Sequence, residues 1–332
     1  MSLKERFAVQ EGMGYEIPRV ADRVPYYLGS ITLFGIIIQL LSGIYLSQFY
    51  NSDPASAHQS ILYIITRAPL GDFIRSVHLW SANFILLTVT LHLLWVLWRG
   101  SYRKPREFTW WAGVLMLGLI FLLYFTGTVL PYDQEGYEAM AHYIAGARGA
   151  GMFGAVFTPE FTPSVEVLSR LYALHISVLP LLLFSVLSLH FYLIRFLDIH
   201  THPGEETGGS TFMKHLRKMF AHGFLFLAVA GLFSLVWPAE LGYPGVEGAE
   251  VTKPPFFFLW IYALENWFGT TALVFGPPFV YLLFFLPPVL DRKESTLPRD
   301  RKGILLVGYG FILLLLVLAL YAWLAPAQEH LM

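Results

Sequence analysis

The sequence contains no cysteine, few charged residues and almost no net charge. Without cysteine the chain can form no disulfide, thiolate metal site or iron–sulfur cluster, and it cannot attach a cofactor through a Cys-X-X-Cys-His motif. Charged residues make up 14% of the chain, whereas a soluble domain carries about 25%. A formal net charge of −1 gives no electrostatic reason to expect a nucleic-acid partner.

Apolar and aromatic side chains are abundant instead, at 56% and 17% of the chain. Long apolar runs recur along the whole sequence, which predicts an all-α, polytopic integral membrane protein in contact with membrane lipid. The first residues, MSLKERFAVQEGMGYE, are polar and lack the apolar core of a cleaved signal peptide. We therefore expect membrane insertion to begin with the first transmembrane helix.

About seven segments are long enough to cross roughly 30 Å of hydrocarbon. The sixth contains two pairs of prolines, at 277–278 and 287–288, which membrane helices tolerate where neighbouring groups satisfy the freed carbonyls. The expected segments are 28–50, 78–98, 110–131, 174–197, 216–237, 268–290 and 303–325.

Basic residues are distributed unevenly between the two sides of these segments. On the side of the N-terminus there are 17 lysines and arginines, and on the other side there are five. The positive-inside rule then predicts a cytoplasmic N-terminus and a C-terminus outside, and we expect a bacterial cytoplasmic membrane. The two long outer loops, 132–172 and 238–267, are where functional loops are expected.

Five of the 11 histidines lie within predicted spans, and four of them form two pairs. His78 and His92 bracket the second span, 14 residues apart, and His175 and His190 bracket the fourth, 15 residues apart. At about 100° per residue, both members of a pair return to nearly the same helix face, about 21–22 Å apart along the axis. Because the second and fourth spans cross the membrane in the same direction, the first histidine of each pair is level with the first of the other.

Hydrogen bonding between helices would explain a single membrane histidine. Four histidines matched in level on two spans that run in the same direction favour two stacked metal sites inside a helical bundle. Zinc or copper fits less well, because each level offers two imidazoles and no nearby carboxylate or thiolate. Haem iron needs two axial ligands, and in a chain without cysteine the two haems would be b-type and non-covalent.

Glycines repeat with the same period on the two other spans. Gly29 and Gly43 lie 14 residues apart on the first span, and Gly113 and Gly127 lie 14 apart on the third. Glycine permits close approach of a backbone to a bulky partner, so these positions are expected to contact haem; ordinary small-residue helix packing is the alternative. Arg75 is expected either to pair with a haem propionate or to be an interfacial anchor.

These residues resemble those of a known family, cytochrome b of the quinol–cytochrome c and quinol–plastocyanin oxidoreductases (the bc and bf complexes). The resemblance covers most of residues 25–197 in order, and details such as LPYDQEGY and the 15-residue histidine spacing are closer to the photosynthetic bf form. The matching stretches are LGSITLFGIIIQLLSGIYLSQFY, IRSVHLWSANFILLTVTLHLLW, SYRKPREFTWWAGV, GTVLPYDQEGYEAM and LSRLYALHISVLPLLLFSVLSLHFYLIR.

The resemblance implies a four-helix dihaem domain at residues 1–204, a three-helix C-terminal part at 205–332, and a homodimer. It implies electron transfer across the membrane between two quinone sites. In the bf form a cysteine near the start of the first span tethers an extra haem; Tyr27 stands at that position here, so that haem is not expected to be covalently bound. The implied iron ligands are His78 and His175 for the outer haem, and His92 and His190 for the inner haem.

The C-terminal part departs from the family at the outer quinone site. The family carries Pro-Glu-Trp-Tyr there, with a glutamate tied to proton release; the equivalent stretch here, Pro254-Pro255-Phe256-Phe257, contains no acid. A proton acceptor has to be a carboxylate or histidine within hydrogen-bond reach of the quinol. Solvated loop charges are the alternative reading of the candidates, which are Asp133, Glu135, Glu138, His142 and Glu265, with Tyr132 as a further cofactor-binding candidate.

On the inner side, a group of histidines and a lysine is expected to bind a quinone and deliver cytoplasmic protons. Such a group also satisfies the positive-inside bias without any function. Its members are His200, His202, His215 and Lys218.

The favoured hypothesis is a dihaem subunit of an oxidoreductase complex, which links a quinone pool to a multihaem cytochrome or another redox module through a non-standard outer site. The alternative is a standard bifurcating quinol–cytochrome c reductase with a Rieske iron–sulfur partner. A transporter or structural subunit with relic histidines is disfavoured, because the ligand set is complete and no internal repeat is evident.

Overall fold

The computed structural model describes residues 16–205, 209–292 and 295–331. The polar N-terminal segment used in the expectation about insertion, and the basic residues Lys4, Arg6 and Lys293 used in the charge count, lie outside these described residues.

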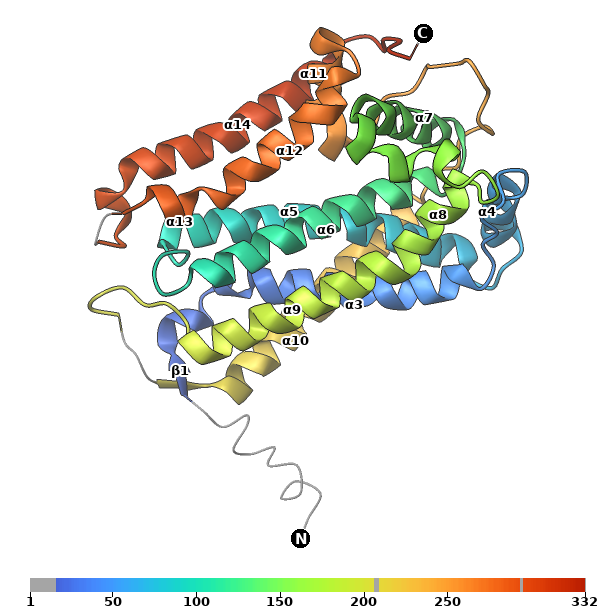
Figure 1. Ribbon diagram of the computed structural model, residues 1–332. Coiled ribbons are helices and arrows are strands. Elements are labelled where there is room, and N and C mark those ends of the chain that lie inside the picture. Colours follow the sequence, from blue (N-terminus) through green and yellow to red (C-terminus); the bar gives the residue numbers. More distant parts are fainter. Residues whose placement is uncertain (1–15, 206–208, 293–294, 332) are drawn as a thin grey trace.

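Four long helices form a bundle at the centre of the molecule (Figure 1). They are α3 (Leu28–Ser47), α5 (Gly71–Arg99), α6 (Glu107–Val129) and α9 (Leu179–Leu197). Helix α3 packs along α5, and α6 packs along α9. All four helices contribute to one core of buried apolar side chains, which includes Ile36, Ile85, Leu86, Ile120 and Leu183.

Short elements cover the two ends of the bundle. One end, called the α7 end below, carries α4 (Ala57–Thr66), α7 (Gln134–Gly149) and α8 (Val167–Ala173), with the 3-10 turns η3 (Gly151–Phe153), η4 (Ala155–Phe157) and η5 (Pro159–Phe161). The other, called the β1 end, carries a two-stranded antiparallel ribbon. Its elements are β1 (Glu16–Pro18), β2 (Gly209–Thr211), η1 (Arg19–Asp22) and η2 (Val24–Tyr27).

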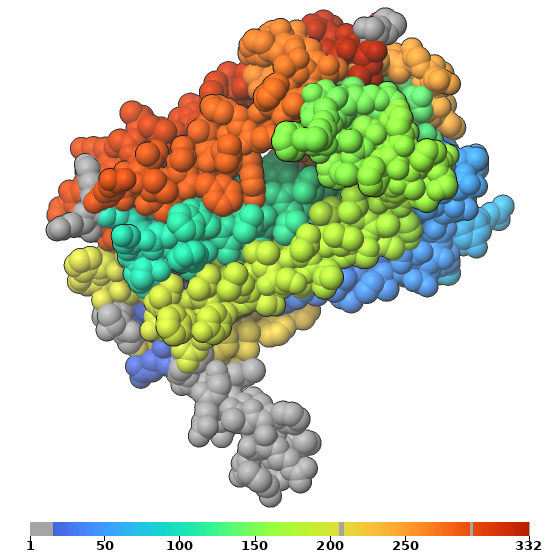
Figure 2. Space-filling view, viewed as in Figure 1, coloured from blue at the N-terminus to red at the C-terminus, as the bar shows by residue number. Residues whose placement is uncertain are grey.

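The remaining helices pack against the bundle. Helix α10 (Phe212–Val236) lies along α3 and α5, whereas α12 (Thr271–Phe285) and α14 (Lys302–Leu324) contact α6 and α5. Figure 2 shows α12 and α14, in orange and red, as a layer over the bundle, with a hollow between this layer and α7. The short elements of the layer are η7 (Phe256–Phe258), α11 (Leu259–Phe268), α13 (Pro287–Leu290) and η8 (Pro298–Asp300). The division of the chain into a dihaem domain at 1–204 and a C-terminal part at 205–332 stays a prediction.

Six helices are long and apolar enough to cross a membrane, and α12 is a shorter apolar helix of 15 residues. The sequence placed a full span at 268–290, but a helix needs about 20 residues to cross the hydrocarbon. Pro277 and Pro278 lie inside α12 without ending it; the helix stops at Phe285, just before the second proline pair. The fold is therefore the expected all-α membrane architecture, with one span shortened.

A buried ionic network joins α14 to α5 at the β1 end. The Arg301 side chain is fully buried and donates to the carbonyls of Leu97 and Trp98, which end α5, and to the Tyr102 hydroxyl. Tyr102 in turn donates to the Asp291 carboxylate, which lies 3.5 Å from the Arg301 guanidinium. A cation at a helix C-terminus also interacts favourably with the helix dipole, so this network fastens the outer layer to the bundle.

We expect Arg301→Ala to lower the midpoint of thermal unfolding in detergent, because it leaves the buried Asp291 with the more distant Arg103, 3.9 Å away, as its cation. Breaking a buried ion pair costs up to about 3–5 kcal/mol. The matched control is Arg299→Ala, since the Arg299 side chain is largely exposed and an exposed ion pair contributes little. Equal midpoints for the two variants would contradict the structural importance of the network.

Candidate functional site

Two histidines from opposite halves of the bundle meet near the α7 end. The rings of His78 on α5 and His175 have centroids 6.3 Å apart. The Nδ1 atom of His78 lies 2.8 Å from the hydroxyl of Ser42, and that of His175 lies 2.8 Å from the hydroxyl of Thr126. Because Nδ1 of each ring is engaged by a neighbouring helix, Nε2 is left as the ligand atom.

A second pair lies nearer the β1 end. His92 on α5 and His190 on α9 are close enough to interact electrostatically. The Nδ1 atom of His190 lies 3.0 Å from the carbonyl of Thr109, whereas Nδ1 of His92 is buried without a hydrogen-bond partner among the described residues. Both helices thus present one imidazole at each of two levels.

Each of the four periodic glycines lies directly against one of these imidazoles. A Cβ built on Gly29 would stand 3.1 Å from His92, and one on Gly127 would stand 3.1 Å from His175. The corresponding distances are 3.4 Å from Gly43 to His78 and 3.6 Å from Gly113 to His190. The glycines on α3 and α6 therefore make room for the rings on their packing partners α5 and α9.

The unequal spacing of the two histidine pairs has a local cause. His175 lies in a π-helical turn, η6 (Leu174–Val178), between α8 and α9. Such a turn inserts one residue into an α-helix and is frequent at functional sites. Pro180 follows it and cannot donate a backbone hydrogen bond to the preceding turn. Because of the extra residue, His175 and His190, 15 residues apart, face the same side of the helix as two residues 14 apart would in a regular α-helix. Helical periodicity alone did not predict this turn.

The residues of both levels fit b-type haem. Two imidazoles that bind one metal ion at about 2.0 Å each have ring centroids about 6 Å apart, close to the 6.3 Å between His78 and His175. The unpartnered, buried Nδ1 of His92 and the space kept by the glycines fit a bulky group between the helices as well. The ligand set contains no thiolate, as expected for iron held by imidazole alone.

Arg75 contacts backbone carbonyls in this structure. Its terminal nitrogens donate to the carbonyl oxygens of Ala239 and Glu240, at 2.6 and 2.7 Å. The guanidinium thereby holds the segment after α10 against the start of α5; its roles toward a propionate and as an interfacial anchor stay predictions.

A cavity of about 320 Å3 opens at the α7 end, beside the segment that replaces the family's acidic motif. Glu135, near the start of α7, lines it together with Pro254, Pro255 and Phe256. Burial, and the nearby carboxylates of Asp133 and Glu138, raise the pKa of Glu135 to about 7. Of the predicted proton acceptors, Glu135 is the one that lines this cavity. The remaining lining residues are Lys253, Leu259 and Trp323.

Two other predicted acceptors have structural partners. Asp133 caps α7 by accepting from the Gly136 amide, and it also accepts from the Gly242 amide. Glu138 is buried and accepts from the amides of Val251 and Thr252, from the Thr252 hydroxyl, and from the Gln134 side chain. Both carboxylates thus hold the loop before η7 against α7.

The other candidates at this end are arranged differently. Phe257 packs inward, with its ring 5.9 Å from that of Tyr124. Tyr132 has a left-handed backbone conformation, with φ 52°, which is strained for a bulky side chain. His142 and Glu265 lie together in a cluster that shares no residue with the lining of the cavity.

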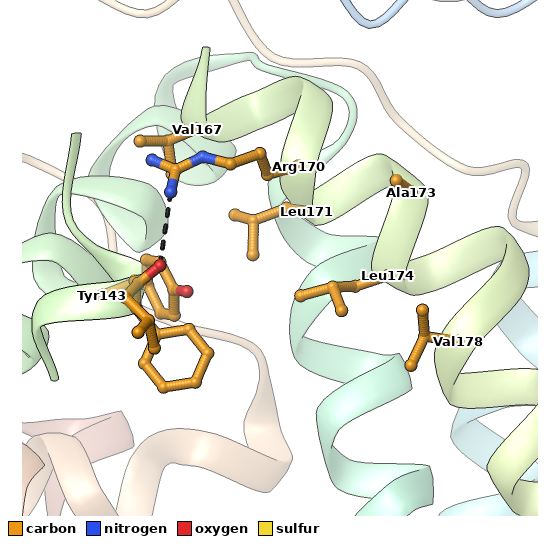
Figure 3. A pocket seen from close by; sticks show the side chains of 9 residues that line it. Tyr143, Val167, Arg170, Leu171, Ala173, Leu174 and Val178 are labelled. Carbon is orange, nitrogen blue, oxygen red and sulfur yellow. Dashed lines mark hydrogen bonds between the residues drawn. The ribbon is translucent and has the colours of Figure 1, made fainter. Parts of the chain in front are cut away.

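A second cavity, of about 310 Å3, lies between α7, η4 and α8 (Figure 3). Its walls are largely apolar and include Leu174 and Val178 of the π-helical turn. The one charged side chain in the wall is Arg170, whose terminal nitrogens donate to the carbonyls of Val156 and Thr158. An apolar space of this size suits a hydrocarbon chain.

The structure divides the candidates at the β1 end into two clusters. In the first, the rings of His200 and His202 are 5.2 Å apart, and Glu205 pairs with Arg99 at 2.5 Å. Burial, followed by the cation of Arg106, lowers the pKa of His200 to about 4. His200 is therefore neutral at physiological pH.

The second cluster is centred on Asp22, which sequence reasoning did not identify. Its carboxylate accepts from the hydroxyls of Tyr27 and Ser210, and Lys218 lies 3.3 Å away. The Tyr27 ring is stacked on His215, with 4.6 Å between centroids. These residues come from segments almost 200 positions apart, joined by the pairing of β1 with β2, so no local pattern reveals them.

Comparisons with known proteins place this geometry in a family. A family model described as Cytochrome b/b6/petB matches residues 14–197. Cytochrome b6 of Heliobacterium mobile is 37% identical over 188 residues, which cover 54% of this chain and 87% of that protein. The cytochrome bc complex cytochrome b subunit of Chlorobaculum thiosulfatiphilum is 28% identical over 326 residues, which cover 91% of this chain and 74% of that protein.

A third relative is the menaquinol:cytochrome c reductase cytochrome b subunit of Bacillus subtilis (strain 168), 32% identical over 176 residues, which cover 51% of this chain and 78% of that protein. A solved chain of "Hyperthermophilic respiratory Complex III" superposes with a TM-score of 0.80 at 23% identity, covering 99% of this chain and 91% of that one. The fold thus extends over nearly the whole chain, including the part that follows the bundle.

The resemblance seen in the sequence is confirmed, and the transporter and structural alternatives give way to electron transfer. The chain belongs to the cytochrome b/b6 family of membrane electron-transfer proteins.

Proposed function

We propose that this chain is the dihaem subunit of a membrane quinol/quinone oxidoreductase and moves electrons across the membrane between two quinone sites. The observation that carries the proposal is the stacking of two facing histidine pairs, each with one imidazole from α5. The 14 residues between the pairs on α5 correspond to about 21 Å of helix. When bound, haem supplies reversible one-electron chemistry at each level.

The α7 end is the outer side in this proposal, and the β1 end faces the cytoplasm of a bacterial cell. The charge bias of the sequence supports this orientation. Relatives described as subunits of cytochrome bc complexes and of a menaquinol:cytochrome c reductase support a quinol substrate. They also support partner redox subunits, such as a cytochrome c or an iron–sulfur protein, and assembly as a homodimer.

At the outer site, Glu135 takes the place of the glutamate that the family's motif carries. A proton acceptor works best with a pKa near the operating pH, and burial brings the Glu135 carboxyl to about 7. It shares the cavity with Pro254, Pro255 and Phe256, whose apolar surfaces suit a quinone ring. The carboxylate comes from the start of α7 instead of from the loop before α11.

At the inner site, the two clusters of the β1 end bind quinone and supply protons. Neutral His200 can hydrogen-bond a quinone; its pKa of about 4 is too low for a proton acceptor at physiological pH. The Asp22 cluster adds a carboxylate that joins Lys218 and His215, and His202 contacts the Thr296 hydroxyl at 3.0 Å. These groups can pass protons toward a quinone that is reduced at this end.

The position of Glu135 favours a second candidate, bifurcating quinol oxidation with a Rieske-type partner, because the outer site keeps a proton acceptor. Purification of the native complex separates the two functions. A Rieske subunit in the active complex supports bifurcation, whereas multihaem cytochromes in its place support a linear path between the quinone and those cytochromes.

We expect His92→Leu to remove the inner haem and leave the outer one, because each pair binds one group. Redox titration of the b-type α-band in detergent should lose one of two waves and about half of the haem. His78→Leu is the reciprocal variant and should lose the other wave. Two results would contradict the dihaem proposal. One is the absence of a b-type α-band from chain purified after expression with ample haem, and the other is that neither variant loses a wave.

We expect Gly127→Val to reduce outer haem content and Gly29→Val to reduce inner haem content, since each added side chain meets an imidazole at 3.1 Å. Pyridine haemochrome assay of the purified variants measures the loss. Gly310→Val is the control, because a Cβ there meets no atom within 4 Å. If all three variants retain two haems per chain, the glycines are not required to keep space at the site.

We expect Glu135→Gln to slow quinol oxidation about 100-fold, in the range of general base catalysis. In the unmodified protein the rate should rise with pH through about 7, because the carboxylate is the accepting form, and the variant should lose this inflection. The control is Glu247→Gln, an exposed residue of the same side. An unchanged pH profile in Glu135→Gln would assign proton transfer to another group.

A further inference from the structure

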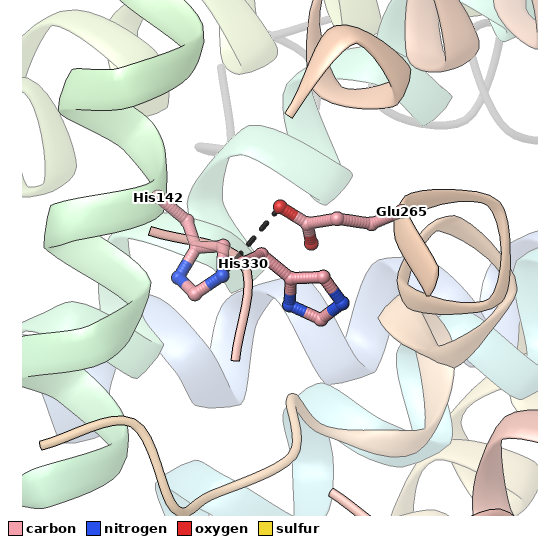
Figure 4. A group of neighbouring side chains, drawn as sticks. All are labelled: His142, Glu265 and His330. Atoms are coloured by element: carbon pink, nitrogen blue, oxygen red, sulfur yellow. Dashed lines mark ion pairs between the residues drawn. The ribbon is translucent and has the colours of Figure 1, made fainter. Parts of the chain in front are cut away.

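Two histidines and two glutamates from four separate segments converge at the α7 end, outside the quinone cavity. Figure 4 shows His142 of α7, Glu265 of α11 and His330, which follows α14, pointing toward one another. Their ligand atoms all lie within 4.8 Å of one another. Glu250, from the loop before η7, lies 3.1 Å from Nε2 of His142 and 3.0 Å from Nδ1 of His330.

The hydrogen bonds of both imidazoles direct one ring nitrogen into this cluster. Nδ1 of His142 lies 2.8 Å from the Glu138 carbonyl, which can only accept, so the hydrogen is on Nδ1 and the lone pair is on Nε2. Nε2 of His330 lies 2.8 Å from the Asn266 carbonyl oxygen, and its Nδ1 faces the cluster, 3.0 Å from Oε1 of Glu250. A second hydrogen bond that fixes the ring in this way is typical of metal-binding histidines.

The Glu265 carboxylate and the His142 ring each have one buried atom that lacks a hydrogen-bond donor within the described part of the chain. Nε2 of His142 and Oε1 of Glu265 are 3.5 Å apart, yet both are buried and neither has a hydrogen-bond partner among the described residues. The side chains of Glu265 and His330 are 2% and 4% exposed. Buried carboxylates are found paired with a positive charge or bound to a metal ion, and this cluster offers the ligand atoms for one.

The distances suit one ion at the centre. Ligand atoms held about 2.0–2.1 Å from a tetrahedral zinc ion are about 3.3 Å from one another. Among the three residues of the cluster, Nε2 of His142 and Oε1 of Glu265 are 3.5 Å apart and all ligand atoms lie within 4.8 Å of one another. Oε1 of Glu250 lies 3.1 Å from His142 and 3.0 Å from His330. Two carboxylates also balance the charge of a divalent ion.

We propose that this chain binds a zinc ion at the α7 end, with His142, Glu265 and His330 as ligands and Glu250 beside them. Two imidazoles and one carboxylate form a zinc ligand set found in proteins. The ion joins α7, α11 and the segment after α14, none of which is adjacent to the others in the sequence. The site is separate from the histidine pairs of the bundle and holds the segment 325–331 beside the quinone cavity.

The test is zinc binding to the detergent-purified, haem-loaded chain, measured by competition with a fluorescent chelator. We expect one tight site per chain, and an affinity reduced about 100-fold or more in His330→Ala and Glu265→Gln, since loss of even an outer-shell partner costs about 10–100-fold. His58→Ala is the control: this histidine lies at the same end but bonds to the Gly242 carbonyl, so its loss should leave the affinity unchanged.

X-ray absorption of the zinc-loaded protein provides a readout that needs no variant. Two imidazoles and oxygen ligands at about 2.0–2.1 Å support the site, whereas an ion surrounded by water oxygens overturns it. Absence of tight zinc binding, or equal affinity in His330→Ala, overturns it as well. The haem spectrum is recorded on the same samples. An intact b-type α-band in a protein that binds no zinc would contradict the zinc site and leave the proposed electron-transfer function unaffected.

Discussion

The structure depends on holding two imidazoles opposite each other at each of two levels between helix pairs. Each ring needs a helix that directs it into the bundle, a second helix packed closely against the first, and a small residue on that second helix that leaves space for the ring. The pairing of α3 with α5 and of α6 with α9 meets all three needs, since the glycines of one helix adjoin the histidines of the other. The remaining elements pack around this arrangement.

The histidine and glycine positions could be predicted because they follow the period of a single helix, which the sequence displays directly. His78, His92, Gly29 and Gly43 needed no tertiary information to be placed on their faces. The length of the sixth helix was overestimated, because hydropathy at 268–290 does not show where a helix with proline pairs ends. Helical packing of distant segments, such as α10 along α3, also follows from no local pattern.

Polar sites at the ends of the bundle were less predictable, because they are assembled from residues far apart in the chain. The sequence offered Asp133, Glu135 and Glu138 as equals, and only burial and hydrogen bonding distinguish them. Glu138 was a reasonable candidate by composition, yet its oxygens are saturated by a loop more than 100 residues away. His330 and Asp22 carried no signal, since their partners are brought near by strand pairing and helix packing.

The π-helical turn at His175 keeps the direction of the two histidine rings constant, although the number of residues between them differs from that on α5. A residue added to a regular α-helix rotates everything beyond it by about 100°, which would turn one of the two rings out of the bundle. Here the added residue is absorbed within a single turn, so His175 and His190 remain in register with their counterparts on α5. The two histidines of each span therefore face the same direction, although 14 residues separate His78 from His92 and 15 separate His175 from His190.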